Sequence, residues 1–367
     1  MTDHLDTQVH KVRSAVLRKK GGPLKIESLE LEGPREDEIL VRIVASGICR
    51  TDIDMFEDWG SADFPVVLGH EGAGVVEQIG KGVKGVSRGD HVVLSYQSCG
   101  RCRHCRRGRP THCERFWELN FGFQRLDGSN AMTRSGVRGH FFGQSSFATH
   151  ALATKRNLVK VAKDLPLEML APLGCGMQTG AGTVMTSLRV SKGSSIALFG
   201  TGAVGLAAVM AARIVGANPI IGVDKEPRRL EVAKELGATH VIDSRHGDVV
   251  LGIKGITGRG VEYVVDTTGN WRMCQLATIV LNPNGTVALL AGGCGSDSLP
   301  EGRKTLGIIQ GDAVPQRFIP KLIELFQKGL FPFDRLVTFY DFDRINMAIA
   351  EATRGDTIKP VLLIGEV

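Results

Sequence analysis

Three glycines, Gly200, Gly202 and Gly205, separate an apolar strand-like run from a long apolar helical run. The run before them is SSIALF, and the run after them is AVGLAAVMAARIVGA. Asp224 ends the next strand-like run, PIIGVD. This G-x-G-x-x-G loop predicts a turn that brings the backbone close to a dinucleotide pyrophosphate, with Asp224 bonded to a ribose hydroxyl. Because an acid here repels a 2′-phosphate, we expect NAD rather than NADP.

The glycine loop lies within a longer alternation of strands and helices. From about Gly176 to 314, apolar strand-like runs alternate with helical runs, which predicts a doubly wound parallel sheet over residues 177–314. From Lys11 to about His150 the pattern changes to short β-branched runs such as EILVRIVASG, which predicts a β-rich domain. We expect residues 315–367 to join that domain with 1–176, its last run, KPVLLIGEV, returning as a strand.

The eight cysteines are the next strongest signal. The N-terminal run MTDHLDTQVHKVR has no apolar core, so we expect no secretory signal and a cytoplasmic protein, in which cysteines serve metals or catalysis more often than disulfides. Four of them follow a C-x2-C-x2-C-x7-C spacing: Cys99, Cys102, Cys105 and Cys113. Four thiolates close a tetrahedral zinc site, so we predict a structural zinc that holds this lobe together.

A dispersed set of zinc-type ligands consists of Cys49 in GICRTD, His70 in GHEGAG and Cys175 in PLGCGMQTG. Two cysteines and a histidine form the open, catalytic kind of zinc site. By spacing alone, lone cysteines and histidines are more often ordinary buried core residues. The remaining cysteines, Cys274 and Cys294, are interpreted as ordinary core or loop thiols.

Charge and hydropathy exclude two other classes of protein. Lys and Arg outnumber Asp and Glu by 45 to 39, but the one dense basic patch, 101–109, is interleaved with cysteines rather than aromatics, so we expect no nucleic-acid binding. Three uncharged stretches, 169–188, 193–212 and 273–296, are broken by glycines, prolines or polar residues. We therefore expect buried strands and turns there, and no membrane span.

The run GHEGAGVVEQIGKGV, Gly69 to Val83, carries a family resemblance. It matches the zinc signature Gly-His-Glu-x2-Gly-x5-Gly-x2-Val of the zinc-dependent medium-chain alcohol dehydrogenases, which the chain resembles over essentially its whole length. The run APLGCGMQTGAGTV is most similar to bacterial aryl- or benzyl-alcohol dehydrogenases. The resemblance implies an α/β chain with a GroES-like catalytic domain and a Rossmann NAD-binding domain.

The resemblance also implies that Cys49, His70 and Cys175 hold a catalytic zinc, which gives two zinc ions per chain. Asp52 would then orient the ring of His70, and Glu71 would lie behind the metal.

Proton transfer is assigned by the same resemblance. Thr51 occupies the position of a hydroxyl relay beside the bound alcohol; a turn or helix-capping role is the alternative. Where liver-type members place a histidine, this chain has Asp54. Either its carboxylate passes the proton to solvent, or Asp54 merely faces solvent and water takes the proton.

Five further residues match cofactor-contact positions of the family. Arg50 and Lys359 would reach the pyrophosphate, and Arg229 would lie over the adenosine ribose. Thr179 and Val204 would pack against the nicotinamide. For each of the three basic residues, an ordinary surface charge is the alternative.

Alignment with the family places Phe141 and Phe142 on the wall of the alcohol pocket, although both could be plain core residues. Ser95 stands where the liver-type enzymes have a bulky phenylalanine, so we expect extra room near the zinc. A cavity with aromatic walls favours a flat substrate.

The sequence therefore predicts reversible oxidation of a primary, aromatic or allylic alcohol to its aldehyde with NAD. The alternatives are a same-fold enzyme for secondary alcohols, polyols or a glutathione adduct of formaldehyde, and a catalytically silent NADH-sensing protein. Sensing needs no proton relay, so Thr51 argues against the silent protein. A homo-oligomer, dimer or tetramer, is implied by the resemblance only.

Overall fold

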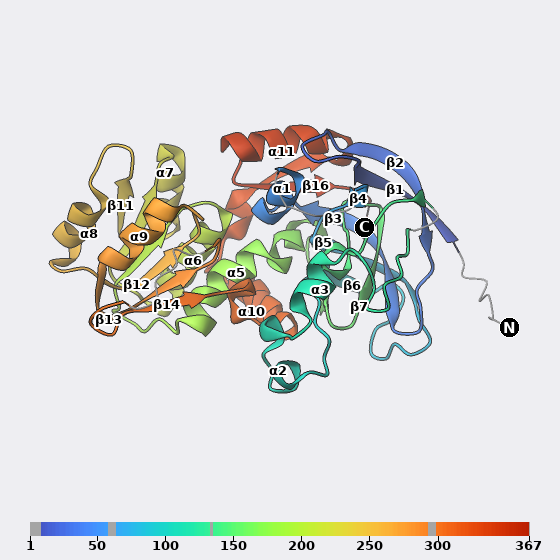
Figure 1. Cartoon of the computed structure of the whole chain (residues 1–367), viewed down its shortest axis with the longest axis horizontal. Coiled ribbons are helices and arrows are strands. Elements are labelled where there is room, and N and C mark those ends of the chain that lie inside the picture. Colours follow the sequence, from blue (N-terminus) through green and yellow to red (C-terminus); the bar gives the residue numbers. More distant parts are fainter. Residues whose placement is uncertain (1–8, 58–63, 133–134, 293–298, 367) are drawn as a thin grey trace. The chain divides into compact units, whose positions relative to one another are not determined.

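The computed structural model describes residues 9–57, 64–132, 135–292 and 299–366, coloured along the chain in Figure 1. They form two compact units. The first contains the described residues up to Cys175, together with Val314–Pro320 and from Leu336 onward; the second contains Gly176–Ala313 and Lys321–Arg335. The predicted first domain includes all of 315–367, whereas Lys321–Arg335 belongs to the second unit of the structure.

The first unit is built on two sheets, as the β-branched runs predict. The smaller sheet has the order β2-β1-β4, with β1 Val9–Leu17, β2 Lys25–Glu32 and β4 Val66–Val67. The larger sheet has the order β15-β16-β3-β5-β6-β8, and β7 pairs with β3. Its strands are β3 Glu38–Gly47, β5 Glu71–Ile79, β6 His91–Leu94, β7 His150–Thr154, β8 Leu158–Val161, β15 Val337–Asp341 and β16 Lys359–Leu363.

The C-terminal strand returns to this sheet, which confirms the prediction for KPVLLIGEV. Strand β16 pairs antiparallel with β3, and Val361 lies opposite Gly47. The start of β16 therefore lies beside the end of β3, two residues before Cys49.

The second unit contains the predicted parallel sheet. Its order is β11-β10-β9-β12-β13-β14, and every pairing is parallel. The strands are β9 Ile196–Phe199, β10 Ile220–Asp224, β11 His240–Asp243, β12 Val261–Asp266, β13 Leu281–Leu289 and β14 Lys304–Gly307. Numbered along the chain, this is the 3-2-1-4-5-6 order of dinucleotide-binding folds, whose ligands lie at the carboxyl ends of the strands where the order reverses. The doubly wound prediction is confirmed.

The helices of the second unit follow sequence signals. Helix α6, Ala203–Val215, ends at Gly216, whose φ of 77° suits a glycine. Helix α7, Pro227–Leu236, begins with a proline in its first turn. The connections after β11 and β12 contain α8 Val249–Thr257 and α9 Trp271–Ile279.

The remaining helices are α1 Arg50–Glu57, α2 Arg103–Arg106, α3 Phe116–Phe121, α4 Leu167–Leu170, α5 Gly176–Gly182, α10 Pro315–Gln327 and α11 Ile345–Arg354. Within the described ranges, none of the helices is long and apolar enough to cross a membrane. Cys274, on α9, is disulfide-bonded, so its interpretation as a thiol is wrong. Cys294 lies outside the described residues.

Candidate active site

The structure brings Cys49, His70 and Cys175 together from three separate segments. Cys49 lies between β3 and α1, His70 directly precedes β5, and Cys175 directly precedes α5. Their ligand atoms and a carboxylate oxygen of Glu71 all lie within 4.8 Å of one another. The Sγ atoms of Cys49 and Cys175 are 4.0 Å apart. Zinc–sulfur bonds of about 2.3 Å in a tetrahedral site put two sulfurs about 3.8 Å apart, so this spacing fits zinc.

Asp52 sets the orientation of His70, as the resemblance implies. Nδ1 of His70 lies 2.9 Å from Oδ1 of Asp52, and the backbone amides of Cys49 and Gly69 donate to the same carboxylate. Nε2 of His70 is buried and has no hydrogen-bond partner among the described residues. A buried nitrogen without a partner is costly unless something else binds it. Its chemistry and its place beside two sulfurs suit a metal ion.

The protonation of the cluster depends on its burial and on its neighbours. Burial by itself lowers the pKa of His70, but the charge and hydrogen bond of Asp52, with a contribution from Cys49, raise it to about 10. The hydrogen bond from Cys175 lowers the pKa of Cys49 well below that of an ordinary thiol, whereas the bond to Cys49 and burial raise the pKa of Cys175. The imidazole and the two thiols therefore interact directly within one buried cluster.

Lys359 is placed differently from what the family resemblance implies. Its side chain is buried in the first unit, with Nζ 2.5 Å from Oε2 of Glu71 and 3.1 Å from the carbonyl oxygen of Ile48. Burial raises the pKa of Glu71, and Lys359 opposes this rise. Lys359 therefore acts as the counter-ion of Glu71 beside the metal cluster.

The two residues predicted to relay the proton, Thr51 and Asp54, lie on the first two turns of α1. Oγ1 of Thr51 is 3.9 Å from Sγ of Cys49, so its hydroxyl lies next to the cluster. Asp54 instead accepts a hydrogen bond from Nε of Arg50 at 2.6 Å, and the two side chains are 45% and 65% exposed. Arg50 also lies 3.7 Å from Glu57. Asp54 thus forms a solvent-facing ion pair with Arg50.

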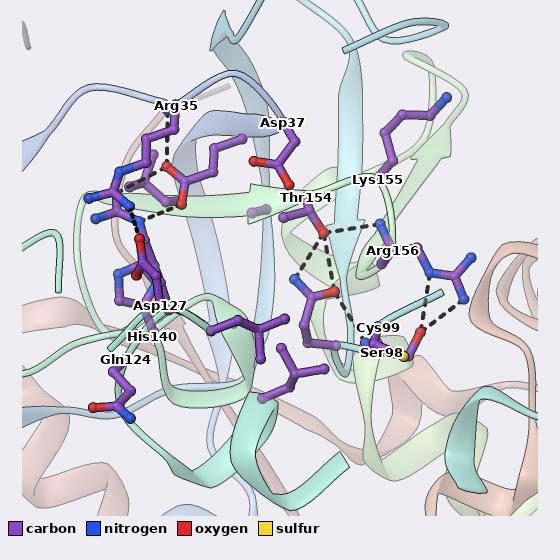
Figure 2. Close-up of a pocket in the computed structure, with 18 of the residues that line it drawn as sticks. Arg35, Asp37, Ser98, Cys99, Gln124, Asp127, His140, Thr154, Lys155 and Arg156 are labelled. Carbon is purple, nitrogen blue, oxygen red and sulfur yellow. Dashed lines mark hydrogen bonds and ion pairs between the residues drawn. The ribbon is translucent and has the colours of Figure 1, made fainter. Parts of the chain in front are cut away.

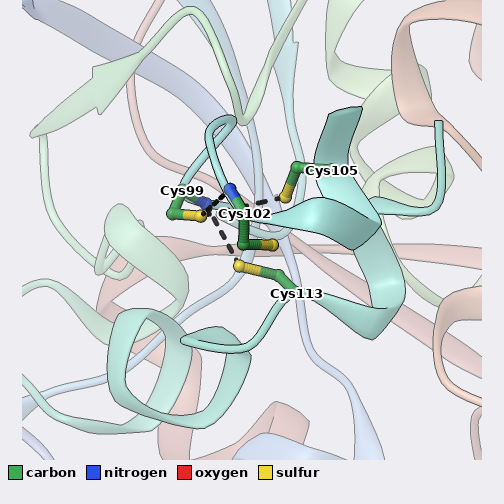
Figure 3. Close-up of side chains that lie close together, drawn as sticks. All are labelled: Cys99, Cys102, Cys105 and Cys113. Atoms are coloured by element: carbon green, nitrogen blue, oxygen red, sulfur yellow. Dashed lines mark hydrogen bonds between the residues drawn. The ribbon is translucent and has the colours of Figure 1, made fainter. Parts of the chain in front are cut away.

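The four-cysteine cluster has the predicted closed form. The sulfurs of Cys99, Cys102, Cys105 and Cys113 lie within 4.8 Å of one another and point toward a common centre (Figure 3). The backbone amide of Cys105 lowers the pKa of Cys102 to about 6, while burial raises that of Cys113 to about 12. Short α2 and 3-10 segments connect the four cysteines within this lobe.

The predicted pocket residues lie against His70. The ring of Phe142 stacks on the imidazole with centroids 4.4 Å apart, and Phe141 meets it edge-on at 5.6 Å. Ser95 is completely buried, and its hydroxyl donates to the carbonyl oxygen of Gly174, next to Cys175. Gln144, which is not among the predicted site residues, donates a hydrogen bond to the carbonyl oxygen of His70. A lone glutamine belongs to no metal motif, and its only signal is its place in the run HFFGQ.

A separate cavity of about 420 Å³ lies in the same unit (Figure 2). Its charged groups are mostly paired with one another or with neutral side chains: Arg35 bonds to Asp127, and Arg156 bonds to Ser98. Of the predicted site residues, only Cys99 is among those lining it. We therefore do not place the reaction there.

The three loop glycines of the second unit have distinct structural roles. Gly200 has a φ of 87°, in the region that favours glycine. A Cβ on Gly205 would lie 1.9 Å from the carbonyl oxygen of Gly200, so α6 can approach β9 only without one. A Cβ on Gly202 would meet nothing nearer than Nη1 of Arg229, at 4.0 Å, which leaves space for a ligand at the helix N-terminus.

Asp224 and Arg229 lie beside this loop. Oδ2 of Asp224 accepts hydrogen bonds from N and Oγ1 of Thr201, and Oδ1 accepts them from the amides of Lys225 and Glu226. Nε of Arg229 is buried without a hydrogen-bond partner in the described part of the chain.

Thr179 and Val204 lie on the neighbouring helices α5 and α6. A Cβ on Gly180 would lie 2.1 Å from the carbonyl oxygen of Val204, so this glycine allows the two helices to approach closely. The structure thus brings both predicted nicotinamide contacts to one region of the second unit.

Sequence and structure comparisons agree with this geometry. Residues 35–163 match the alcohol dehydrogenase GroES-like domain family, and residues 203–327 match the zinc-binding dehydrogenase family. Geraniol dehydrogenase from Castellaniella defragrans is 44% identical over 365 residues, covering 96% of this chain and 97% of that protein. Benzyl alcohol dehydrogenase from Acinetobacter calcoaceticus is 43% identical with a TM-score of 0.93, covering 97% of this chain and 100% of that chain.

A zinc-binding-domain alcohol dehydrogenase protein from Burkholderia ambifaria is 47% identical with a TM-score of 0.94, covering 98% of this chain and 100% of that chain. The predicted family, fold class and enzyme class are confirmed. The chain belongs to the zinc-binding alcohol dehydrogenase family.

Proposed function

We propose that this enzyme oxidises primary aromatic or allylic alcohols to aldehydes with NAD, at a zinc ion held by Cys49, His70 and Cys175. One observation carries the assignment of the site. Nε2 of His70 is buried without a hydrogen-bond partner among the described residues, and it belongs to a cluster whose two sulfurs are 4.0 Å apart. Two thiolates and an imidazole are a donor set that zinc prefers.

When bound, zinc supplies Lewis-acid chemistry that lowers the pKa of a hydroxyl, and NAD supplies a hydride acceptor. Asp52 keeps Nδ1 of His70 occupied, so Nε2 stays available as a ligand. The Thr51 hydroxyl, beside Cys49, accepts the proton of the substrate hydroxyl and passes it outward. Because Asp54 is paired with Arg50 at the surface, water is favoured as the final proton carrier.

NAD binds, in this proposal, at the loop from Gly200 to Gly205, where the open space at Gly202 and the α6 N-terminus suit a pyrophosphate. All four acceptor positions of the Asp224 carboxylate are filled by protein donors. The Thr201 hydroxyl is the donor that can rotate away, so a ribose hydroxyl would take its place. Nε of Arg229, which has no hydrogen-bond partner among the described residues, would donate to the adenosine end of the cofactor.

The substrate class rests on the aromatic rings of Phe141 and Phe142 beside His70, and on relatives named for geraniol and benzyl alcohol. Burial of a flat substrate against such rings gains about 3 kcal/mol over ethanol. We expect kcat/KM for benzyl or allylic terpenoid alcohols to exceed that for ethanol by at least about a hundredfold.

Absorbance of NADH at 340 nm with NAD and a panel of primary, allylic, benzylic and secondary alcohols tests this expectation. Equal efficiency on ethanol, or a preference for secondary alcohols, contradicts the aromatic or allylic substrate. A homo-oligomer of two or four subunits and a cytoplasmic location remain predictions from the sequence.

A further inference from the structure

The loop from His140 to Ser146 holds an unusual backbone conformation next to His70. Three of its non-glycine residues have positive φ: His140 at 66°, Phe142 at 52° and Ser145 at 54°. Residues with a Cβ seldom adopt this region, because the side chain then crowds the backbone. Such a conformation persists only where surrounding contacts enforce it. The contacts made by this loop are therefore informative.

Gln144 makes the central contacts of the loop. Its side chain is buried, and Nε2 donates hydrogen bonds to the carbonyl oxygens of His70 at 2.9 Å and Ser95 at 3.1 Å. Oε1 accepts a hydrogen bond from the amide of Gly72 at 3.1 Å. One amide thus connects the loop to both sides of Glu71 and to the segment after β6.

Ser145 holds the same loop through two further hydrogen bonds. Its Oγ accepts a hydrogen bond from the amide of Phe141 at 2.9 Å and donates to the carbonyl oxygen of Val67 at 2.7 Å. These bonds hold the backbone where the ring of Phe142 stacks on His70. The imidazole is therefore held at its face by Phe142 and at Nδ1 by Asp52.

The network of Gln144 also extends toward the second sulfur ligand. Ser95, whose carbonyl oxygen accepts from Gln144, donates its hydroxyl to the carbonyl oxygen of Gly174 at 2.7 Å. Gly174 directly precedes Cys175. A continuous path of buried hydrogen bonds therefore runs from the carbonyl group of His70, through Gln144 and Ser95, to the residue before Cys175.

We propose that Gln144 is a positioning residue for the catalytic metal centre. By bonding to His70 and Ser95 together, it keeps Nε2 of His70 and Sγ of Cys175 at the separation that a metal ion requires. This inference rests on the proposed zinc site of Cys49, His70 and Cys175. It concerns how that site is held, and it assigns no contact between Gln144 and the substrate.

Asn120 offers a matched control for Gln144. It is also fully buried, and its amide makes the same set of bonds: it donates to the carbonyl oxygens of Gln97 and Phe116 and accepts from the amide of Gln97. None of these partners belongs to either metal cluster. Gln144→Met and Asn120→Leu each remove three hydrogen bonds with little change in side-chain size.

The test measures zinc affinity of the catalytic site by competition with a chromophoric chelator, and the visible spectrum of Co²⁺ exchanged into that site. We expect Gln144→Met to weaken zinc binding by about tenfold to a hundredfold and to shift the cobalt bands, because positioning partners of metal ligands have effects of this size. The value of kcat should fall, while the KM for NAD stays unchanged. Asn120→Leu should leave affinity and spectrum at wild-type values.

A wild-type zinc affinity and cobalt spectrum in Gln144→Met overturns the inference, as does an equal loss in Asn120→Leu. If Gln144→Met does not fold, Gln144→Glu serves as the second variant, because it keeps an acceptor for the amide of Gly72 and removes the amide donor that bonds to His70 and Ser95. A smaller shift in the same direction supports the inference, and wild-type values oppose it. A wild-type chain that binds only one zinc ion would instead contradict the proposed function.

Discussion

The ammonium nitrogen of Lys359 lies 2.5 Å from a carboxylate oxygen of Glu71, and both side chains are almost completely buried. Removing one partner of a buried ion pair leaves the other charge without compensation. We therefore expect Lys359→Met to lower the free energy of unfolding by about 3–5 kcal/mol, measured by urea denaturation. Adding Glu71→Gln in the same chain should restore part of this loss.

The variant Lys359→Met distinguishes a counter-ion of Glu71 from a contact to the cofactor pyrophosphate. Unchanged stability together with a raised KM for NAD would contradict the counter-ion role and favour the pyrophosphate contact that the family resemblance implies.

The two metal clusters should be separable by mutation. His70→Ala should remove one of two zinc ions and lower turnover by at least about a thousandfold, because it removes a ligand of the catalytic site. Affinity for NADH, measured by fluorescence titration, should stay within about tenfold, since His70 and the glycine loop belong to different units. Cys105→Ser should also remove one zinc ion, but mainly lower the thermal stability. A hundredfold loss of NADH affinity in His70→Ala would contradict this separation.

Thr51→Val keeps the shape of the side chain and removes the hydroxyl. We expect it to slow alcohol oxidation by about a hundredfold or more and to change the pH profile of kcat, because a positioned proton-transfer group contributes this much. Asp54→Asn is the control, since Asp54 forms an exposed ion pair with Arg50. Its pH profile should match the wild type, and a shifted profile would restore Asp54 as the relay.

Asp224→Ala should weaken NAD binding by about tenfold to a hundredfold, because hydrogen bonds to a charged group contribute about 1.5–3 kcal/mol. The variant should also relieve the repulsion of the 2′-phosphate of NADP, so the preference for NAD over NADP should decrease. Asp243, paired in register with Asp224 on the next strand and bonded to Arg245, provides the control Asp243→Ala. An unchanged preference in Asp224→Ala would remove this residue from the cofactor site.

His140 should make the fold sensitive to acid. Burial, with a contribution from Arg125, lowers the pKa of His140 from 6.5 to about 4, and Nε2 accepts a hydrogen bond from the amide of Ala131. Between these pH values the unfolded chain binds a proton that the folded chain does not, so the free energy of unfolding decreases as the pH falls. At pH 4.5 it should be about 2–3 kcal/mol lower than at pH 7. His140→Asn, which tolerates positive φ, should remove this part of the slope in urea unfolding measured at pH 7 and pH 4.5. An unchanged slope would show that His140 is not responsible.

Much of the architecture follows from local sequence patterns. The glycine loop, the apolar runs and Asp224 predict the parallel sheet of the second unit, because backbone requirements at tight turns and the periodicity of buried faces are properties of short segments. The spacing of the four cysteines predicts their cluster for the same reason, since all four ligands lie within one short lobe.

The sequence alone does not predict contacts between distant segments of the chain. The spacing of Cys49, His70 and Cys175 does not group them, and only the family resemblance predicts that they share one site. Lys359 is predicted to contact the pyrophosphate, but the pairing of β16 with β3 buries it beside Glu71. The bonds of Gln144 to His70 and Ser95 likewise depend on how strands and loops pack. Hydrogen bonding and charge compensation depend on distances in space, so only the tertiary structure decides which buried polar groups become partners.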